Sequence, residues 1–341
     1  MASYAPMGGY AGAQSGAAYA GDSYAPLPQY APPPPQYAPP GPSPTNGAPG
    51  DRARFDDLVA RLELRPDMAD DLFGVLSTTT VVLLLDDSGS MATRVADPLS
   101  APFARGGPAT RWSELEMFTV TAVDIITATS PGGVDVYFLD RPGMSGVTSA
   151  QQLAPAFATG PRGGTPIIGA LSRIFRQYAA LAATRRVLVV VITDGEPSDG
   201  TTRQLFNVLA TQRHPNIHVS LAEMSDDEAT MRFLDGWDQQ LLQFDNSDDY
   251  RMEARRVRQQ KGYSYKFRSG EGRGGGGWGG GGGAVCVRVF ARARRTPDCP
   301  PTPPSYNDYV VKVLLGSLMR KYFMLDGGGA LQMDDCCCAI A

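Results

Sequence analysis

Three separate stretches of the sequence carry oxygen-bearing side chains at positions where a parallel sheet would bring them together. The first, VVLLLDDSGSM, places an Asp-x-Ser-x-Ser pattern directly after a run of branched apolar residues. The second, GGTP, has a threonine after a glycine pair, and the third, VVVITDGEPSD, has an aspartate after another apolar run. Hydroxyl and carboxylate oxygens without imidazole or thiolate select Mg²⁺, or else Mn²⁺ or Ca²⁺, over zinc or copper. The candidate metal ligands are Asp86, Ser88, Ser90, Thr165 and Asp194.

The elements that would position these ligands alternate between residues 79 and 222. Apolar runs typical of buried parallel strands alternate with helical periodicities, which predicts an α/β fold with a doubly wound, Rossmann-like sheet flanked by helices. The expected strands are 81–85, 134–139, 187–192 and 217–221, and the expected helices include 112–125, 167–178, 205–209 and 227–242. Because the carboxyl ends of parallel strands share one edge of the sheet, we expect the five ligands to converge there.

The three motifs, in this order on these elements, resemble the metal-ion-dependent adhesion site of von Willebrand factor A (vWA) domains. The resemblance covers about residues 81–237 and implies that the five ligands surround an ion, some of them through water. The flanking residues resemble intracellular vWA proteins of fungi, algae and protists more than integrins. Alone, an Asp-x-Ser-x-Ser pattern is usually a turn or a helix cap, and the two later motifs are what favour a metal site here.

The ligand set also predicts what the ion would bind. Three neutral hydroxyls and two carboxylates leave the ion electrophilic, so that an Asp or Glu of a protein partner could complete its coordination. The sequence lacks a P-loop, a nucleophile elbow, a Cys-His couple and a zinc ligand set, which favours an adaptor or scaffold over an enzyme such as a metal-dependent hydrolase. A net charge of −4 does not favour nucleic acid, and the single GRGGGG stretch fits a linker better than an RNA-binding segment.

Other polar residues near these motifs have simpler interpretations. Asp87 lies outside the ligand spacing, and we expect it to be solvated or in a salt bridge. Glu196 and Asp199 are interpreted as charges at a helix entry rather than as ligands. His214 and His218 are interpreted as ordinary loop and strand residues rather than as a zinc pair.

Composition divides the chain into six segments. The outer segments are too poor in apolar residues to offset the entropy of ordering, which predicts disorder. The expected divisions are a Pro/Tyr-rich disordered tail at 1–50, a short helical lead-in at 51–78, a vWA core at 79–258, a Gly/Arg/Pro-rich insertion at 259–306, a closing helix at 307–326 and a flexible tail at 327–341.

The last four residues, Cys-Ala-Ile-Ala, match the C-a-a-X pattern that is typical of farnesylation at Cys338. Cys336 and Cys337 directly precede it and suit palmitoylation, and two lipid chains give stable membrane residence where one is marginal. No signal peptide or membrane-spanning run is present, so we expect a cytoplasmic protein anchored at the cytosolic face of a membrane. A chance cysteine cluster, or metal or redox chemistry, is the alternative.

Two tetrapeptides match P-P-x-Y, a motif whose extended shape WW domains bind in an aromatic groove. Many such WW domains belong to ubiquitin ligases, so an adaptor of the ubiquitin pathway is the alternative function. The match at 34–37 could arise by chance in a Pro/Tyr-rich segment. The match at 303–306 directly precedes the expected closing helix and could serve the fold rather than binding. The candidate WW-binding residues are Pro34, Pro35, Tyr37, Pro303, Pro304 and Tyr306.

Overall fold

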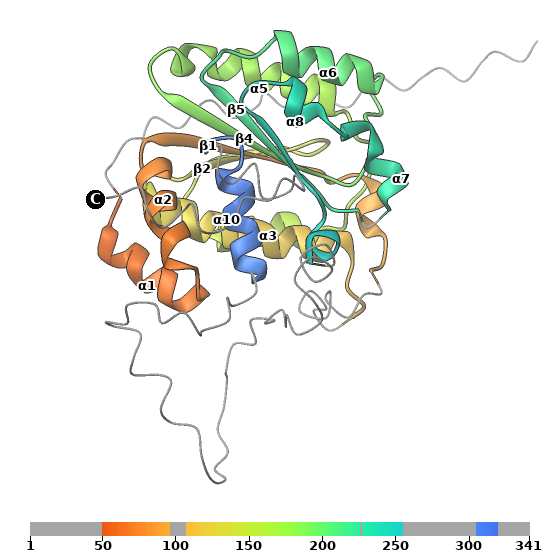
Figure 1. Cartoon of the computed structure of the whole chain (residues 1–341). Coiled ribbons are helices and arrows are strands. Elements are labelled where there is room, and N and C mark those ends of the chain that lie inside the picture. The colour runs from red at the N-terminus through yellow and green to blue at the C-terminus, as the bar shows by residue number, and fades with distance from the viewer. Residues whose placement is uncertain (1–49, 96–106, 226, 255–304, 320–341) are drawn as a thin grey trace, which may run out of the picture. The chain divides into compact units, whose positions relative to one another are not determined.

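A computed structural model describes residues 50–95, 107–225, 227–254 and 305–319. In this part of the chain a six-stranded sheet lies between two layers of helices (Figure 1). The strand order is β3-β2-β1-β4-β5-β6, and every neighbouring pair is parallel except β2 with β3. The predicted α/β class, with helices on both sides of a mostly parallel sheet, is confirmed.

Four of the strands coincide with the predicted apolar runs, and two short edge strands do not. The predicted ones are β1 (Thr79–Leu85), β2 (Val134–Phe138), β4 (Arg186–Thr193) and β5 (Ile217–Glu223). The edge strands β3 (Met144–Val147) and β6 (Phe244–Ser247) were not predicted. Their sequences, MSGV and FDNS, contain no apolar run: β3 is mostly accessible to solvent, whereas β6 is largely buried although two of its buried residues are the polar Asp245 and Ser247.

Alternate residues of β1 supply two separate cores. Val81, Leu83 and Leu85 face the layer that contains α3 (Arg111–Thr129) and α10 (Tyr306–Leu315). Val82 and Leu84 face the layer that contains α5 (Ile167–Ala182) and α6 (Thr202–Thr211). Because successive side chains of a strand point to opposite faces, an unbroken apolar run is what a sheet covered on both sides requires.

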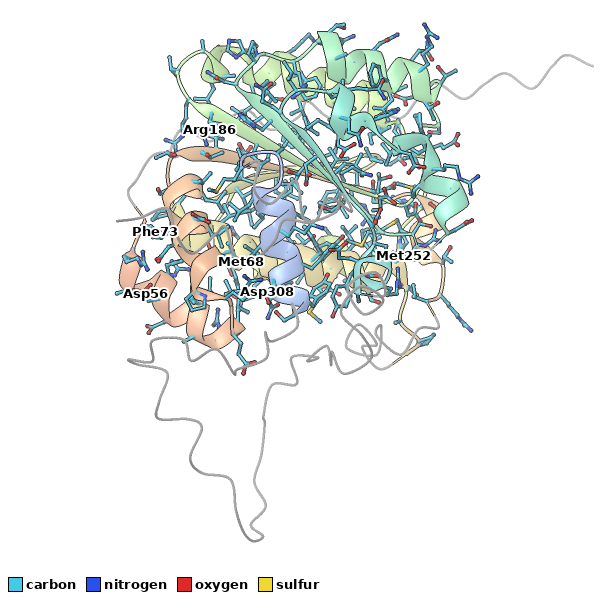
Figure 2. All side chains as sticks on the ribbon, viewed as in Figure 1. Asp56, Met68, Phe73, Arg186, Met252 and Asp308 are labelled. Atoms are coloured by element: carbon cyan, nitrogen blue, oxygen red, sulfur yellow. The ribbon has the colours of Figure 1, made fainter. Side chains whose placement is uncertain are left out.

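The lead-in predicted at 51–78 forms two amphipathic helices in the α3 layer, α1 (Arg52–Leu62) and α2 (Pro66–Leu76). Asp308 lies at the start of α10 (Figure 2), and its carboxylate accepts a hydrogen bond of 3.3 Å from the Arg65 amide beside α2. The remaining helical elements are short: η1 (Gly89–Ala92), η3 (Ala150–Leu153), α4 (Ala154–Ala158), α7 (Glu228–Met231), η4 (Arg232–Leu234) and α8 (Trp237–Gln240).

Two predicted helices were too long. The helix expected at 227–242 is divided into α7, η4 and α8, and Gly236, with a left-handed φ of 72°, separates η4 from α8. Leu234 and Trp237 are buried as expected. The closing helix expected at 307–326 ends at Leu315, where the next residue, Gly316, lies against Asp245 with no room for a side chain.

Several predictions concern residues outside the described ranges. These are the Pro/Tyr-rich tail, most of the Gly-rich insertion, the cysteines of the C-a-a-X pattern and the first P-P-x-Y motif. Among the described helices, none combines the length and the hydropathy that crossing a membrane would require.

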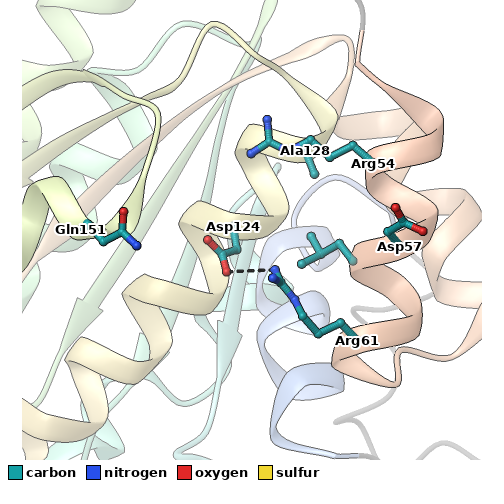
Figure 3. A pocket seen from close by; sticks show the side chains of 7 residues that line it. Arg54, Asp57, Arg61, Asp124, Ala128 and Gln151 are labelled. Carbon is teal, nitrogen blue, oxygen red and sulfur yellow. Dashed lines mark hydrogen bonds and ion pairs between the residues drawn. The ribbon is translucent and has the colours of Figure 1, made fainter.

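A pocket of about 390 Å³ lies between α1, α3 and η3 (Figure 3). Arg61 and Asp124 form an ion pair of 3.4 Å in its wall. Asp124 lies 13 residues after Arg111, at the far end of α3, which corresponds to about 20 Å along a helix. This pocket is therefore separate from the edge of the sheet on which the candidate ligands lie.

Candidate metal centre

The candidate ligands Asp86 and Asp194 directly follow β1 and β4, two neighbouring strands at the centre of the sheet. From β1 the chain continues toward β2 on one side, and β4 lies on the other side, so the strand order reverses between them. In open α/β sheets, the crevice outside the carboxyl ends of strands at such a reversal is the usual ligand site. The topology therefore places both carboxylates where a ligand is expected.

Asp86 is held from two sides and is nearly inaccessible to solvent. Its Oδ1 accepts from the Ser88 amide at 2.9 Å, and its Oδ2 accepts from the Thr193 hydroxyl at 2.6 Å. Burial raises the pKa of Asp86 to about 6, against the opposing effect of hydrogen bonds from Ser88 and Thr193. A bound cation would act in the opposite direction from burial and favour the carboxylate.

The other ligand oxygens form a continuous chain. The Ser90 hydroxyl donates to Asp194 Oδ1 at 2.7 Å, and the hydroxyl oxygens of Ser88 and Ser90 are 2.9 Å apart. Oxygens that occupy adjacent corners of an octahedral Mg²⁺ shell are about 3.0 Å apart, since each lies about 2.1 Å from the ion. Ser90 is exposed, so the chain opens to solvent on one side. The spacing and the hard oxygen donors thus fit a magnesium ion.

Thr165 lies on the adjoining loop. The Gly89 amide donates to the Gly163 carbonyl at 3.2 Å, which joins the Asp-x-Ser-x-Ser loop to the GGTP loop. Ser198 then fixes Thr165, because its hydroxyl accepts from the Thr165 amide at 2.8 Å and its amide donates to the Thr165 carbonyl at 2.9 Å. Four of the five candidate ligands therefore form one hydrogen-bonded cluster, and the fifth is on a loop bonded to it.

An arginine that the sequence analysis did not assign to the site lies at its edge. Arg111 donates from Nη1 to Asp194 Oδ2 at 2.9 Å and from Nη2 to the Ser225 hydroxyl at 3.0 Å. The described residues contain no group of three or more His, Cys, Asp or Glu side chains that could hold a metal. An ion at this cluster would therefore depend on hydroxyl ligands as well as on its two carboxylates, one of which is already paired with Arg111.

A second pocket, of about 200 Å³, adjoins the site through Ser225. Burial, with the nearby Asp248, Asp249 and Asp235 as weaker contributors, raises the pKa of Glu223 to about 8, although Asn246 donates to this carboxylate. Its lining is mostly acidic and consists of Glu223, Ser225, Met231, Arg232, Asp235, Asp248 and Met252.

The interpretations of the neighbouring polar residues can be compared with their contacts. Asp87 forms a salt bridge of 2.6 Å with Arg141, as predicted. The Asp199 carboxylate accepts from the Ile168 and Gly169 amides at the start of α5, which confirms it as a helix-entry charge. His218 lies in β5, where its Nδ1 is 2.7 Å from the Ser317 carbonyl, and is an ordinary strand residue.

The second P-P-x-Y motif overlaps the folded part of the chain. Tyr306 is the first residue of α10, and its ring packs against Tyr250 and Tyr309 at centroid distances of 5.0 and 6.1 Å. Its hydroxyl donates to the Glu114 carbonyl at 3.4 Å. A WW domain binds an extended segment, so Tyr306 would have to leave this cluster to be recognised. Pro303 and Pro304 lie outside the described residues, and recognition of this motif stays a prediction.

Sequence reasoning missed four residues that position the ligands: Arg111, Arg141, Thr193 and Ser198. Thr193 directly precedes Asp194 and forms the end of β4, so its proximity to the site was implicit in the strand assignment. Arg111 contacts Asp194 from a helix start and Ser198 contacts Thr165 from a loop, whereas Arg141 contacts Asp87 beside the candidate ligands. No local pattern distinguishes these three from ordinary surface residues.

A comparison of the sequence with protein-family models finds no match, and a comparison with curated proteins finds none either. The interpretation of the site therefore depends on its own residues and geometry.

Proposed function

We propose that this chain is a vWA-type adaptor that binds a protein partner through a Mg²⁺ ion held by the cluster at the ends of β1 and β4. The supporting observation is the Asp194–Ser90–Ser88 chain of oxygens, whose spacings of 2.7 and 2.9 Å match the edges of an octahedral shell. Mn²⁺ or Ca²⁺ could replace Mg²⁺ at such a site. The proposed ligands are Asp86, Ser88, Ser90, Thr165 and Asp194.

The charge balance of the cluster supports an acidic partner. Arg111 already compensates part of the negative charge of Asp194, and the two serines are neutral. A divalent ion at this position would keep net positive charge, and when bound it would supply a Lewis-acidic position for an incoming carboxylate. Ser90 lies on the exposed side of the cluster, from which an Asp or Glu side chain of a partner would approach.

The direct test is Mg²⁺ titration of the full chain by isothermal titration calorimetry, with Asp194→Ala as the variant and Asp199→Ala as the matched control. Asp199 lies in the same loop as Asp194 but caps the start of α5, so its loss removes a carboxylate without removing a proposed ligand. We expect Mg²⁺ binding to be lost in Asp194→Ala and retained in the control. Equal binding by Asp194→Ala and the wild type would refute the proposed site.

A second experiment tests the partner. The immobilised full chain is exposed to a cell lysate in Mg²⁺ and in EDTA, alongside Asp194→Ala in Mg²⁺. Proteins retained only by the wild type in Mg²⁺ would be metal-bridged partners, and their binding should be competed by an acidic peptide but not by its amide counterpart. If the same proteins bind in all three conditions, the metal does not mediate binding. Phosphoester hydrolysis that is lost in Asp86→Ala would instead favour a hydrolase.

A further inference from the structure

Asp87, the second aspartate of the DDSGS loop, makes contacts with two other loops at the same edge of the sheet. Its side chain is fully buried. The carboxylate accepts from the Asp140 amide at 2.9 Å and from Arg141 Nε at 2.6 Å, and both donors follow β2. Its carbonyl accepts from the Arg162 amide at 2.7 Å, in the segment that leads into GGTP. Asp87 therefore connects the loop that carries Ser88 and Ser90 to the loop that carries Thr165.

Arg141 extends this connection to the segment before Thr165. Its Nη1 donates to the carbonyls of Ala156 and Thr159, at 2.7 and 3.1 Å. Its Nη2 donates to the Gly160 carbonyl at 3.0 Å. Together with the bond to Asp87, the guanidinium makes four hydrogen bonds, and three of them satisfy backbone acceptors at the end of α4. Unbonded carbonyls at a helix end favour a cation in this position.

Two aromatic side chains contact the guanidinium. The Cζ of Arg141 lies 5.1 Å from the ring centroid of Trp112 and 5.5 Å from that of Phe138. Trp112 is itself tied to the same segment, because its Nε1 donates to the Phe157 carbonyl at 3.1 Å. A lysine would keep the charge but could reproduce neither the planar stacking nor the several fixed donors.

A contact through Asp140 adds a third connection. Gly163 has a φ of 95°, which favours glycine, and the Asp140 carboxylate lies against its α-carbon and accepts a hydrogen bond from the Gly164 amide. The loop that follows β2 therefore contacts the GGTP loop through Asp140 as well as through Arg141.

We propose that Asp87 and Arg141 are positioning residues: they hold the Asp-x-Ser-x-Ser loop and the 156–165 loop in register before any ion binds, and thereby set the affinity of the site for Mg²⁺. The effect on Mg²⁺ affinity rests on the proposed function. The contacts of Asp87 and Arg141 that hold the two loops together, which we call the clamp, are present in the metal-free chain. Ordering a loop costs conformational entropy, so a site whose loops are already held binds more tightly than one that must order them. Removing residues that orient metal ligands typically weakens metal affinity about 10- to 100-fold.

The test uses Arg141→Lys and Asp87→Asn in the full chain, with Arg162→Lys as the matched control. Arg162 is an exposed arginine in the same loop, and its hydrogen bond to Asp87 comes from its backbone amide, which the substitution keeps. Hydrogen–deuterium exchange of the metal-free proteins reports on residues 156–165, and MgCl₂ titration by calorimetry reports the affinity. Circular dichroism checks that each variant is folded, and Asp87→Asn is the milder change should Arg141→Lys not fold.

We expect both variants to exchange faster than the wild type at 156–165 and to bind Mg²⁺ at least about tenfold more weakly, with the control unchanged in both measurements. Unchanged exchange in the folded variants would overturn the clamp. Faster exchange with unchanged Mg²⁺ affinity would overturn its role in setting affinity. If the wild type itself binds no Mg²⁺, the proposed function fails, and the exchange data still decide whether the clamp exists.

Discussion

Two charged regions meet at the first turn of α3 and balance their charges in different ways. Arg111 opens this helix and reaches the proposed metal cluster, where it is paired with Asp194. Glu114, one turn later, pairs instead with Arg251 at 3.2 Å. Arg251 also pairs with Asp249, and the side chains of Glu114, Asp249 and Arg251 are all fully buried.

The second region, which we call the α10 ion network, matches each cation with a carboxylate of the same chain. It continues from Arg251 to the pair formed by Lys312 of α10 and Glu253, at 3.2 Å. The network therefore fastens residues 249–254 and α10 to α3. Its members are Glu114, Asp249, Arg251, Glu253 and Lys312.

This difference in charge pairing suggests a structural role for the α10 ion network and a binding role for the proposed metal cluster. In the network each cation is paired with a carboxylate, and removing one partner leaves an uncompensated buried charge. The metal cluster instead combines buried carboxylates with neutral hydroxyls and is open to solvent at Ser90. We expect substitutions in the network to change stability and substitutions in the cluster to change ligand affinity.

The largest effect is expected for Arg251→Met in the network. The loss of the only cation that contacts both Asp249 and Glu114 in the described ion pairs should lower the free energy of unfolding by about 3–5 kcal/mol. Urea unfolding measures this, with the exposed Arg54→Met as the control. A loss below about 1 kcal/mol would mean that the network contributes little, and the contrast between the regions would fail.

A smaller effect is expected from Glu223, which lines the pocket between the two regions. Its pKa is about 8 in the folded chain and near 4.5 in the unfolded chain, so the folded state retains a proton that the unfolded state has lost. The free energy of unfolding should therefore fall as pH rises between about 4.5 and 8, by about 2 kcal/mol from pH 6 to pH 8.

Glu223→Gln should remove this part of the pH dependence, because the amide does not titrate. Urea unfolding of both proteins at pH 6, 7 and 8 measures the difference. If the free energy of unfolding changes equally with pH in the variant and the wild type, the pKa of Glu223 is not raised in the folded chain.

The smallest effect is expected for Arg111→Gln in the metal cluster. Asp194 would lose a competing positive charge, so Mg²⁺ should bind about tenfold more tightly, which corresponds to about 1.4 kcal/mol. Glutamine keeps a donor that can serve Ser225. Calorimetric titration measures the change, and weaker binding would instead assign Arg111 to the positioning of Asp194.

Local sequence patterns were sufficient to predict the structure of segments whose conformation depends mainly on their own residues. The branched apolar runs of β1 and β4 predicted buried strands, and the polar residues after them were correctly expected at one edge of the sheet. The edge strand β6 was missed because FDNS has no apolar run, and the helix break at Gly236 was missed because a helical pattern tolerates an isolated glycine.

The sequence by itself determined the α/β class, the strands at the centre of the sheet and the order in which the candidate ligands follow them, because periodicity and residue type express these locally. Only the tertiary structure decided which polar residues became partners. Asp87 meets Arg141 54 positions away, and Glu114 of α3 meets Arg251, which is also distant in the sequence. Such pairs form because each buried charge needs a counter-charge, and any carboxylate and any arginine would look equally suited before the chain has folded.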